Sequence, residues 1–312
     1  MRWVTYTSPL DGSERAGVLG ERGVYGGAPG TSLTGLIEQG EAGLTAAGRA
    51  LLSQPAELVP LEAAPLQPPI PVPPSIRDFM AFENHAVTSI EAIGGTLSPA
   101  WYQIPAFYFT NPAAVRGPRE PVPVSPGSTA FDYELEVAAV IGAPGENISV
   151  KDAERHIAGF MVLCDWSARD LQEHEMAIGL GPAKGKDTAT SFGPWLITPD
   201  ELADVRTARG YDLAMTAEVN GRRYSAGNWS TLYWTFAQMI AYASRGTRLR
   251  PGDVIGSGTV GTGCILELSR VHGSGGYPWL RPGDHVSLAI ERLGSIGAAI
   301  LPAAAGEPLQ PS

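Results

Sequence analysis

The chain has 312 residues, of which 44% are hydrophobic and 17% charged, and it carries a formal net charge of −10. This length can bury a substantial core, and we expect one large domain together with a small one. The acidic balance argues against nucleic acid and against an anionic membrane surface as partners, because both carry negative charge themselves.

No apolar run approaches the roughly 18 residues of a membrane-spanning helix, and no basic stretch followed by an apolar one opens the chain. The two cysteines, Cys164 and Cys264, make neither a disulfide framework nor a zinc pattern. Cys164 ends an apolar run and is expected to pack beneath the site described below. We therefore expect a cytoplasmic protein without a membrane span.

The first 70 or so residues are predicted to form a small α+β unit. Residues 2–7 alternate like a strand, and residues 16–19 with 23–25 indicate a following hairpin. Ser32 can cap a short helix that runs through Gln39, and residues 41–52 are Ala-rich and helical in pattern. From about residue 55, eight prolines within residues 55–74 predict an extended linker. We place the boundary there, between a domain of residues 1–70 and one of residues 71–312.

The second domain is predicted to be dominated by strands, because its many Gly and Pro residues break the chain into short segments. Strands are expected at residues 78–82, 107–110, 131–140, 157–165, 195–198, 212–219, 222–224, 254–258, 264–271 and 285–290. Helices are expected at residues 83–94, 150–158, 167–176 and 231–244. Asn220-Gly221 is a strong hairpin turn. The pattern as a whole indicates a β-rich α+β fold.

Glu134 and Glu136 stand two apart in the predicted strand 131–140, so both carboxylates leave the same face of the sheet. Two like charges side by side are unfavourable unless something positive lies between them, and a hard divalent cation meets that need. Asp165, at the end of an apolar run, and Asp78, in a third segment, can add two more carboxylates. The alternative is a solvated sheet face. Taken together, these carboxylates predict a metal site in an enzyme.

Other site signatures are absent from the sequence. There is no Walker A loop and no G-x-S-x-G elbow. Residues 256–263, GSGTVGTG, superficially resemble a dinucleotide loop, but no βαβ pattern surrounds them. We interpret this stretch as a turn at the mouth of the active site, whose backbone N–H groups can bind an anion.

Six segments together resemble the fumarylacetoacetate hydrolase superfamily: RDFMAFENH, FDYELEV, CDWSARDLQ, GPAKGKDTATSFGPW, YWTFAQMIAYASRGTRLRPGDVIGSGT and CILELSR. The resemblance covers roughly residues 70–300 in the order of the family, and the pairing of ELE with DWSARD is its most specific part. The first 70 or so residues resemble the family's variable N-terminal domain only loosely. The resemblance implies a catalytic domain of mixed β-sheets rolled around the site, normally in a homodimer.

The resemblance also assigns metal ligands. Glu134, Glu136 and Asp165 match the family's metal carboxylates, and Asp78 matches the fourth ligand of the eukaryotic-type hydrolase. Four carboxylates would suit Ca²⁺, while Mg²⁺ or Mn²⁺ with fewer direct ligands and bound waters is an equal alternative.

For catalysis, the resemblance points to His85 and Glu267. His85 follows Asp78 at the spacing of the family's general base, and Glu267 matches the carboxylate that orients this histidine. Many smaller family members lack this glutamate, so its presence favours hydrolysis of a carbon–carbon bond. The alternatives are a surface or capping role for His85 and an outward-facing strand position for Glu267.

Lys186 matches the family lysine that reaches the substrate's oxygens, although Lys184 is close enough to leave the choice open. Arg169 and Gln172 lie on one face of a predicted helical turn and match residues that hold the substrate's carboxylate or water. Arg169 could instead form an ion pair with its neighbour Asp170 or with Glu173.

Tyr108 and Thr259 match a substrate-contacting tyrosine and a carboxylate-binding threonine, the alternative for Tyr108 being a bonded core position. The chain departs from the hydrolase pattern at three places. These are the segment FYFTNP, a shortened loop before Glu267, and Asp187, which follows the lysine. The first two departures leave the acyl group of the substrate open.

These assignments favour hydrolysis of a β-diketo acid, such as an acylpyruvate, by water that His85 activates. One alternative is an isomerase or decarboxylase of 2-hydroxy-diene-dioates from aromatic meta-cleavage, which KGKDTATSFGPW favours. Another is a non-catalytic metal-binding protein on the same scaffold. In either enzyme the partner is a small keto-acid substrate, and residues 83–105 would form a lid over it.

Overall fold

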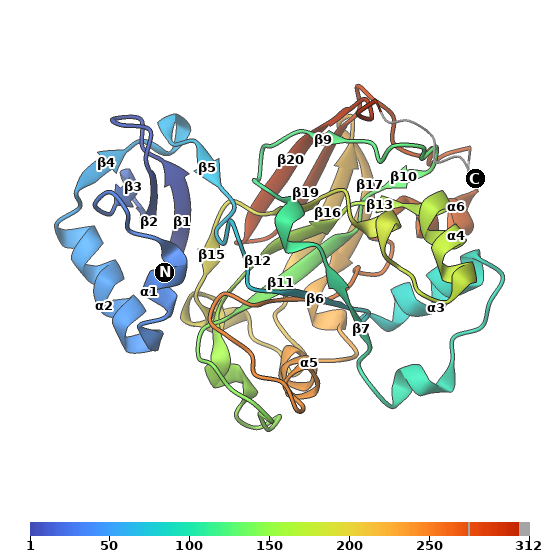
Figure 1. The fold of residues 1–312 in the computed structure, drawn as a ribbon, viewed down its shortest axis with the longest axis horizontal. Coiled ribbons are helices and arrows are strands. Elements are labelled where there is room, and N and C mark those ends of the chain that lie inside the picture. The colour runs from blue at the N-terminus through green and yellow to red at the C-terminus, as the bar shows by residue number, and fades with distance from the viewer. Residues whose placement is uncertain (274, 306–312) are drawn as a thin grey trace, which may run out of the picture.

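The computed structural model describes residues 1–273 and 275–305, so the last residues of the predicted second domain lie outside the described part. Figure 1 shows a small N-terminal part, in blue, beside a larger body rich in strands. The predicted fold class, a β-rich α+β fold, is confirmed.

The N-terminal part contains the elements that the sequence predicted, namely β1 (Arg2–Thr7), β2 (Glu14–Gly20), β3 (Gly23–Gly26), α1 (Leu33–Ile37) and α2 (Gly40–Ser53). Two short strands, β4 (Glu57–Val59) and β5 (Leu66–Gln67), were not predicted. Ser32 caps α1 by accepting a hydrogen bond from the Gly35 backbone N–H at 3.1 Å. The Pro-rich stretch is largely extended, but β4 pairs with β3 and β5 with β1, so the predicted linker is partly incorporated into the sheet.

A large sheet runs through the whole molecule in the order β4-β3-β2-β1-β15-β12-β11-β18-β6-β7, with β5, β8 and β14 off this path. Its remaining members are β6 (Ile76–Phe79), β7 (Phe107–Thr110), β8 (Val115–Arg116), β11 (Leu135–Ile141), β12 (Ile157–Asp165), β14 (Thr190–Phe192), β15 (Leu196–Ile197) and β18 (Val254–Gly256). The pairing of Arg2 with Ile197 joins the first residues to this sheet. The division into two domains stays a prediction.

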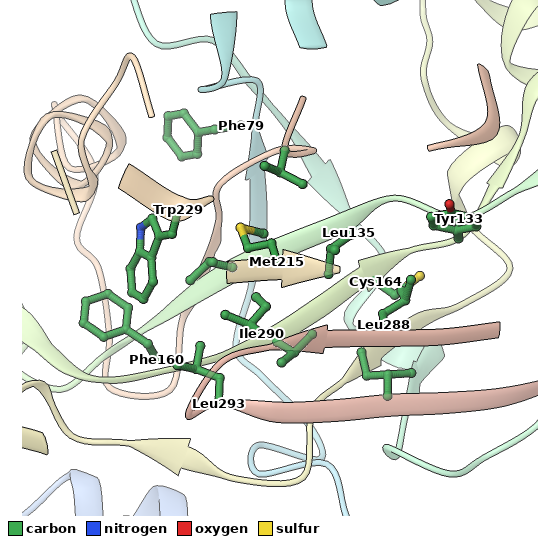
Figure 2. Close-up of a cluster of buried hydrophobic side chains, with 14 of the residues drawn as sticks. Phe79, Tyr133, Leu135, Phe160, Cys164, Met215, Trp229, Leu288, Ile290 and Leu293 are labelled. Atoms are coloured by element: carbon green, nitrogen blue, oxygen red, sulfur yellow. The ribbon is translucent and has the colours of Figure 1, made fainter. Parts of the chain in front are cut away.

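A second sheet, of order β17-β16-β19-β20-β9, covers one face of β11 and β12. Its strands are β9 (Val122–Pro123), β16 (Ala214–Val219), β17 (Arg222–Asn228), β19 (His285–Ile290) and β20 (Gly294–Leu301), and the sequence did not predict β20. Figure 2 shows Leu135 of β11 and Phe160 of β12 packed with Met215 and Ile290 of the second sheet. The two sheets therefore enclose the main apolar core.

The other face of β11 packs against a second core. Ala138 and Val140 of β11 lie there with Met161 of β12 and Trp3 of β1. Because both faces are covered, all seven residues of β11 are buried. The face of Ala138 is also the face of Glu134 and Glu136, so the two glutamates are held inside the protein rather than in solvent.

Four helices belong to the larger body: α3 (Glu83–Ala92), α4 (Arg169–Ile178), α5 (Phe236–Ala243) and α6 (Ile265–His272). The helix predicted at residues 150–158 is only a 3₁₀ turn, Ala153–His156, before β12 begins. The helix predicted from residue 231 starts later, because Thr235 and Gln238 form a capping box in front of Phe236. None of the described helices is long and apolar enough to cross a membrane.

The strand predicted at residues 264–271 is wrong, because this segment forms α6. Ile265 and Leu268 are buried on one side at helical spacing. The carboxylate of Asp132 accepts hydrogen bonds from the backbone N–H groups of Ile265 (2.7 Å) and Leu266 (3.1 Å). These N–H groups have no partner within a helix, so a distant carboxylate caps the helix start.

A buried ion pair ties β4 to the N-terminal strands. Glu57 accepts hydrogen bonds from Tyr6 and from Ser8 (2.9 Å), and it lies 3.3 Å from the Arg15 guanidinium. The Arg15 and Glu57 side chains are only 5% and 3% exposed. Replacing Glu57 with alanine leaves the buried arginine without this partner.

We expect Glu57→Ala to lower the free energy of unfolding by about 3 kcal/mol, measured by urea denaturation. Glu62→Ala, a change of an exposed glutamate in the neighbouring 3₁₀ turn, serves as the control. Equal losses in both variants would show that the buried pair does not stabilise this part of the fold.

Candidate active site

The four predicted metal carboxylates are all buried in the larger body. Glu134 precedes β11, Glu136 lies in it, Asp165 ends β12 and Asp78 lies in β6. Their exposed fractions are 6%, 1%, 0% and 2%. Strand β18 lies between β6 and β11. Its residue Gly256 pairs with Asp78 of β6 in parallel and with Ala138 of β11 in antiparallel orientation. The carboxylates from three distant segments thus gather in one buried region.

One lysine and one tyrosine connect these carboxylates. Lys186 donates hydrogen bonds to Glu134 (2.7 Å) and to Asp165 (2.6 Å). The Tyr108 hydroxyl donates to Asp165 and lies 3.3 Å from Asp78. Lys184 is exposed and pairs with Asp187, so Lys186 is the lysine that reaches the buried carboxylates.

Arg169 forms a second bridge within the site. Its guanidinium lies 2.7 Å from Glu134 and 2.8 Å from Asp132, and it also donates to Gln172 at 3.1 Å. The alternative pairing with Asp170 does not occur, because Asp170 accepts hydrogen bonds from Ser128 and Thr129 instead. Burial opposes the charge of Arg169, but the two carboxylates outweigh it and raise the pKa of the guanidinium well above its usual range.

Asp132 is a site residue that the sequence analysis did not identify. It is completely buried, and it holds both Arg169 and the start of α6. The signal that could have revealed it is the alternation of acids at 132, 134 and 136 in FDYELEV. Through Asp132, the helix that carries Glu267 and the arginine beside Glu134 share one anchor.

His85 and Glu267 lie together as expected. His85 is in the first turn of α3, Glu267 in the first turn of α6, and the two helices contact each other. The Nδ1 atom of His85 is 3.0 Å from Oε2 of Glu267, although the two atoms are not aligned as a hydrogen bond. Burial lowers the pKa of His85, but the charge of Glu267 outweighs burial, so the net shift is upward from 6.5.

The glycine-rich turn, residues 256–263, holds the carboxylates of Glu136 and Glu267 through its backbone. Gly258 N–H donates to Glu136 at 3.0 Å, and Thr262 N–H donates to Glu267 at 3.2 Å. Two N–H groups of this turn therefore bind carboxylates of the protein itself. Thr259, in the same turn, is 1% exposed, and its hydroxyl finds no partner in the described part of the protein.

The carboxylates have the properties that a cation site requires. Three buried oxygens, Asp78 Oδ1, Glu136 Oε1 and Asp165 Oδ1, make no hydrogen bond within the described residues. Burial and the charge of Asp165 raise the pKa of Asp78 to about 7. Burial and the charge of the adjacent Asp78 raise the pKa of Glu136 well above its usual value. A divalent cation would satisfy these oxygens and remove their mutual repulsion.

The carboxylates of Asp78 and Glu136 can lie beside residue 256 because it is glycine. A Cβ atom there would lie 2.5 Å from Asp78 Oδ1 and 3.2 Å from Glu136 Oε2. No three of the four carboxylates have ligand atoms within 4.8 Å of one another. Across residues 1–273 and 275–305, the group that meets this distance is His85, Cys264 and Glu267. Lys186 lies between Glu134 and Asp165, and Tyr108 lies between Asp165 and Asp78.

A cavity of about 480 Å³ opens beside Lys186. Phe109 and Asn111 from the FYFTNP segment line it, together with Lys184 and Asp187. The residues that depart from the hydrolase pattern thus surround a space next to the lysine.

Residues 75–301 match the family model described as the C-terminal domain of fumarylacetoacetate (FAA) hydrolase. A fumarylacetoacetase from Oryza sativa subsp. japonica is 30% identical over 262 residues, which are 68% of this chain and 61% of that protein. The chain thus spans about three-fifths of the length of the curated relatives it matches.

Solved structures share the fold over nearly the whole chain. A probable 2-hydroxyhepta-2,4-diene-1,7-dioate isomerase from Mycobacterium abscessus is 26% identical, with a TM-score of 0.72 over 98% of this chain and 100% of that chain. A maleylpyruvate hydrolase from Sphingobium sp. SYK-6, in complex with manganese(II) and pyruvate, is 24% identical. Its TM-score is 0.72, over 97% of this chain and 100% of that chain, and at this identity the likeness bears on the fold alone.

Proposed function

Because the chain belongs to the fumarylacetoacetate hydrolase family, we propose that it is a metal-dependent hydrolase that cleaves a carbon–carbon bond in a β-diketo acid. The observation that carries the proposal is the buried contact of His85 Nδ1 with Glu267 Oε2 at 3.0 Å. A carboxylate in this position orients an imidazole and stabilises its protonated form, which is what a general base for water needs.

His85 would use Nε2 as the base, because its Nδ1 atom faces Glu267. Removal of a proton from water at Nε2 gives the hydroxide that attacks the distal carbonyl carbon. The imidazolium that results is stabilised by Glu267 and can return the proton to the leaving carbon. Glu267 is held for this role by the backbone N–H of Thr262.

The substrate's negative charge has three candidate partners in the site. Lys186 and Arg169 would stabilise charge that develops on the carbonyl oxygen during attack. Both are buried, so their charges act in a region with little screening by water. The unpartnered hydroxyl of Thr259 would bind the substrate's carboxylate, and the cavity beside Lys186 would accept the acyl group.

Asp78, Glu134, Glu136 and Asp165 would hold a divalent cation, for which Mg²⁺, Ca²⁺ and Mn²⁺ are the candidates. Bound there, the cation supplies Lewis-acid polarisation of the keto and enol oxygens. The unpartnered oxygens of Asp78, Glu136 and Asp165 support this assignment.

The alternative is an isomerase or decarboxylase of a 2-hydroxy-diene-dioate. It is supported by the likeness to the probable isomerase from Mycobacterium abscessus, while the likeness to the plant fumarylacetoacetase supports hydrolysis. The same residues can protonate and deprotonate a dienol carbon when no water is positioned for attack.

One experiment separates the two reactions. The enzyme, loaded with Mn²⁺ or Mg²⁺, is incubated with a panel of acylpyruvates, and pyruvate release is followed with lactate dehydrogenase. Hydrolysis predicts pyruvate and a carboxylic acid in equal amounts. Tautomerised product or CO₂ without pyruvate would remove the hydrolase proposal in favour of the alternative.

We also propose a homodimer, which light scattering after size-exclusion chromatography tests.

Replacing Glu267 with glutamine is expected to move the acid limb of the kcat/KM profile to lower pH by about one unit. His85 must be neutral to accept a proton, and Glu267 keeps its pKa above 6.5, so activity in the native enzyme falls as pH drops through that raised value. Without the carboxylate, Glu267 no longer opposes the effect of burial, and the pKa of His85 falls. The plateau rate should fall too, because the imidazolium loses its partner. An unmoved acid limb would show that His85 is not the titrating base.

A further inference from the structure

A second group of potential metal ligands lies beside the carboxylates, and nothing in the proposed reaction requires it to bind a metal. His85, Cys264 and Glu267 place one ligand atom each within 4.8 Å of one another. We name these three residues the thiol cluster. Their exposed fractions are 5%, 0% and 1%, so the cluster is closed to bulk water.

The distances within the thiol cluster are those of a compact metal site. The Cys264 thiol lies 3.4 Å from Glu267 Oε2, and His85 Nδ1 lies 3.0 Å from the same oxygen without a hydrogen bond. Tetrahedral zinc, with bonds of about 2.0–2.3 Å, keeps its ligand atoms about 3.4 Å apart. The cluster needs only small side-chain movements to reach this spacing.

The fold also presents these ligands in a suitable way. Cys264 immediately precedes α6 and Glu267 lies in its first turn, so both face α3, which carries His85. The other oxygen of Glu267 is already bound by the Thr262 N–H at 3.2 Å. Oε2 is therefore the oxygen left for a cation, and the His85 nitrogen without a hydrogen bond faces it.

The chemistry of these ligands differs from that of the carboxylate site. Thiolate and imidazole prefer soft or borderline cations such as Zn²⁺, whereas carboxylates alone suit Mg²⁺, Ca²⁺ and Mn²⁺. One thiolate, one carboxylate and one neutral imidazole would balance the charge of a divalent cation. A neutral complex is the form that a buried position tolerates best.

We propose that the thiol cluster binds a thiophilic divalent cation of the Zn²⁺ class and that this binding inhibits the enzyme. On binding, the S–H bond of Cys264 breaks, its proton passes to solvent, and the sulfur becomes a ligand. The Glu267 carboxylate then binds the cation instead of facing His85. The inhibition rests on the proposed function, because it follows from the loss of the His85–Glu267 pair, whereas the binding does not.

Binding is tested with Co²⁺, added to the Mn²⁺-saturated enzyme, because a thiolate bound to Co²⁺ gives a charge-transfer absorption that oxygen ligands do not give. The native protein is expected to show this absorption at one Co²⁺ per chain, and Cys264→Ser to lack it. Cys164→Ala removes the other buried cysteine and should leave the absorption unchanged. No absorption in the native protein, or an equal one in Cys264→Ser, would overturn the proposal.

His85→Ala provides a second variant should Cys264→Ser fail to fold. It keeps the thiol but removes the nitrogen ligand, so the absorption should require roughly tenfold or more Co²⁺. An unchanged Co²⁺ titration would exclude His85 as a ligand and contradict the site as proposed.

Inhibition is tested separately, by titrating Zn²⁺ into the Mn²⁺-saturated enzyme. The concentration for half inhibition should rise roughly tenfold or more in Cys264→Ser, whose hydroxyl can still donate to Glu267. Equal inhibition of both proteins would show that Zn²⁺ acts elsewhere. Absence of acylpyruvate hydrolysis would contradict the proposed function but leave the Co²⁺ result standing.

Discussion

Replacing His85 with alanine is expected to lower kcat/KM about 10³-fold while the divalent cation still binds at the carboxylates. The imidazole is the only group placed beside Glu267 that can take a proton from water near neutral pH, within the residues that the structure describes. None of the four carboxylates is hydrogen-bonded to His85, so its loss leaves them in place. Activity is measured as pyruvate release, and cation affinity by calorimetry.

The matched control is Glu91→Ala, which changes an exposed residue of the same helix, α3. It should keep full activity, so that a loss in His85→Ala cannot come from a general disturbance of the helix. An active His85→Ala protein would rule out the water-activation step. A loss of cation binding in that variant would mean instead that His85 is itself part of the carboxylate site.

Gly256→Ala is expected to weaken divalent-cation binding about 10- to 100-fold without changing any charge. The added methyl group would lie 2.5 Å from Asp78 Oδ1, which is closer than real Cβ atoms approach another atom, and 3.2 Å from Glu136 Oε2. One of the two carboxylates must move out of the site to make room. The affinity is measured by calorimetry with Mn²⁺, and the thermal shift that Mn²⁺ causes should shrink with it.

Gly275→Ala is the control for this variant, because a Cβ atom there meets nothing within 4 Å. It tests whether a glycine-to-alanine change as such alters stability or cation binding. If Gly256→Ala bound Mn²⁺ as tightly as the native protein, the cation could not lie between Asp78 and Glu136. The assignment of the carboxylates as its ligands would then be wrong.

The sequence predicted the carboxylates of the candidate site from local signals and its other residues through the family resemblance. Glu134 and Glu136 share a face in any strand, and the structure places both on the buried face that they share with Ala138. The choice between Lys184 and Lys186 stayed open, because two lysines so close in sequence differ only in which one the folded chain turns inward. The structure turns Lys186 toward Glu134 and leaves Lys184 exposed.

Helix α6 shows why a local pattern was insufficient. Residues 264–271 contain apolar residues that fit a strand as well as a helix. The helix starts where it does because Asp132, 133 residues earlier, accepts hydrogen bonds from its first free N–H groups. No short stretch of sequence contains that information.

By itself, the sequence determined most of the elements and which side chains are available for chemistry. The two-residue period of strands, the turn-forming glycines and prolines, and the charges of particular side chains are properties of the local chain. The tertiary structure alone decided several of the contacts: Arg169 with Asp132, Glu267 with Cys264, and a glycine at 256 beside Asp78. Most such contacts join residues far apart in the chain, and they depend on how the sheets and helices pack rather than on any residue's neighbours in sequence.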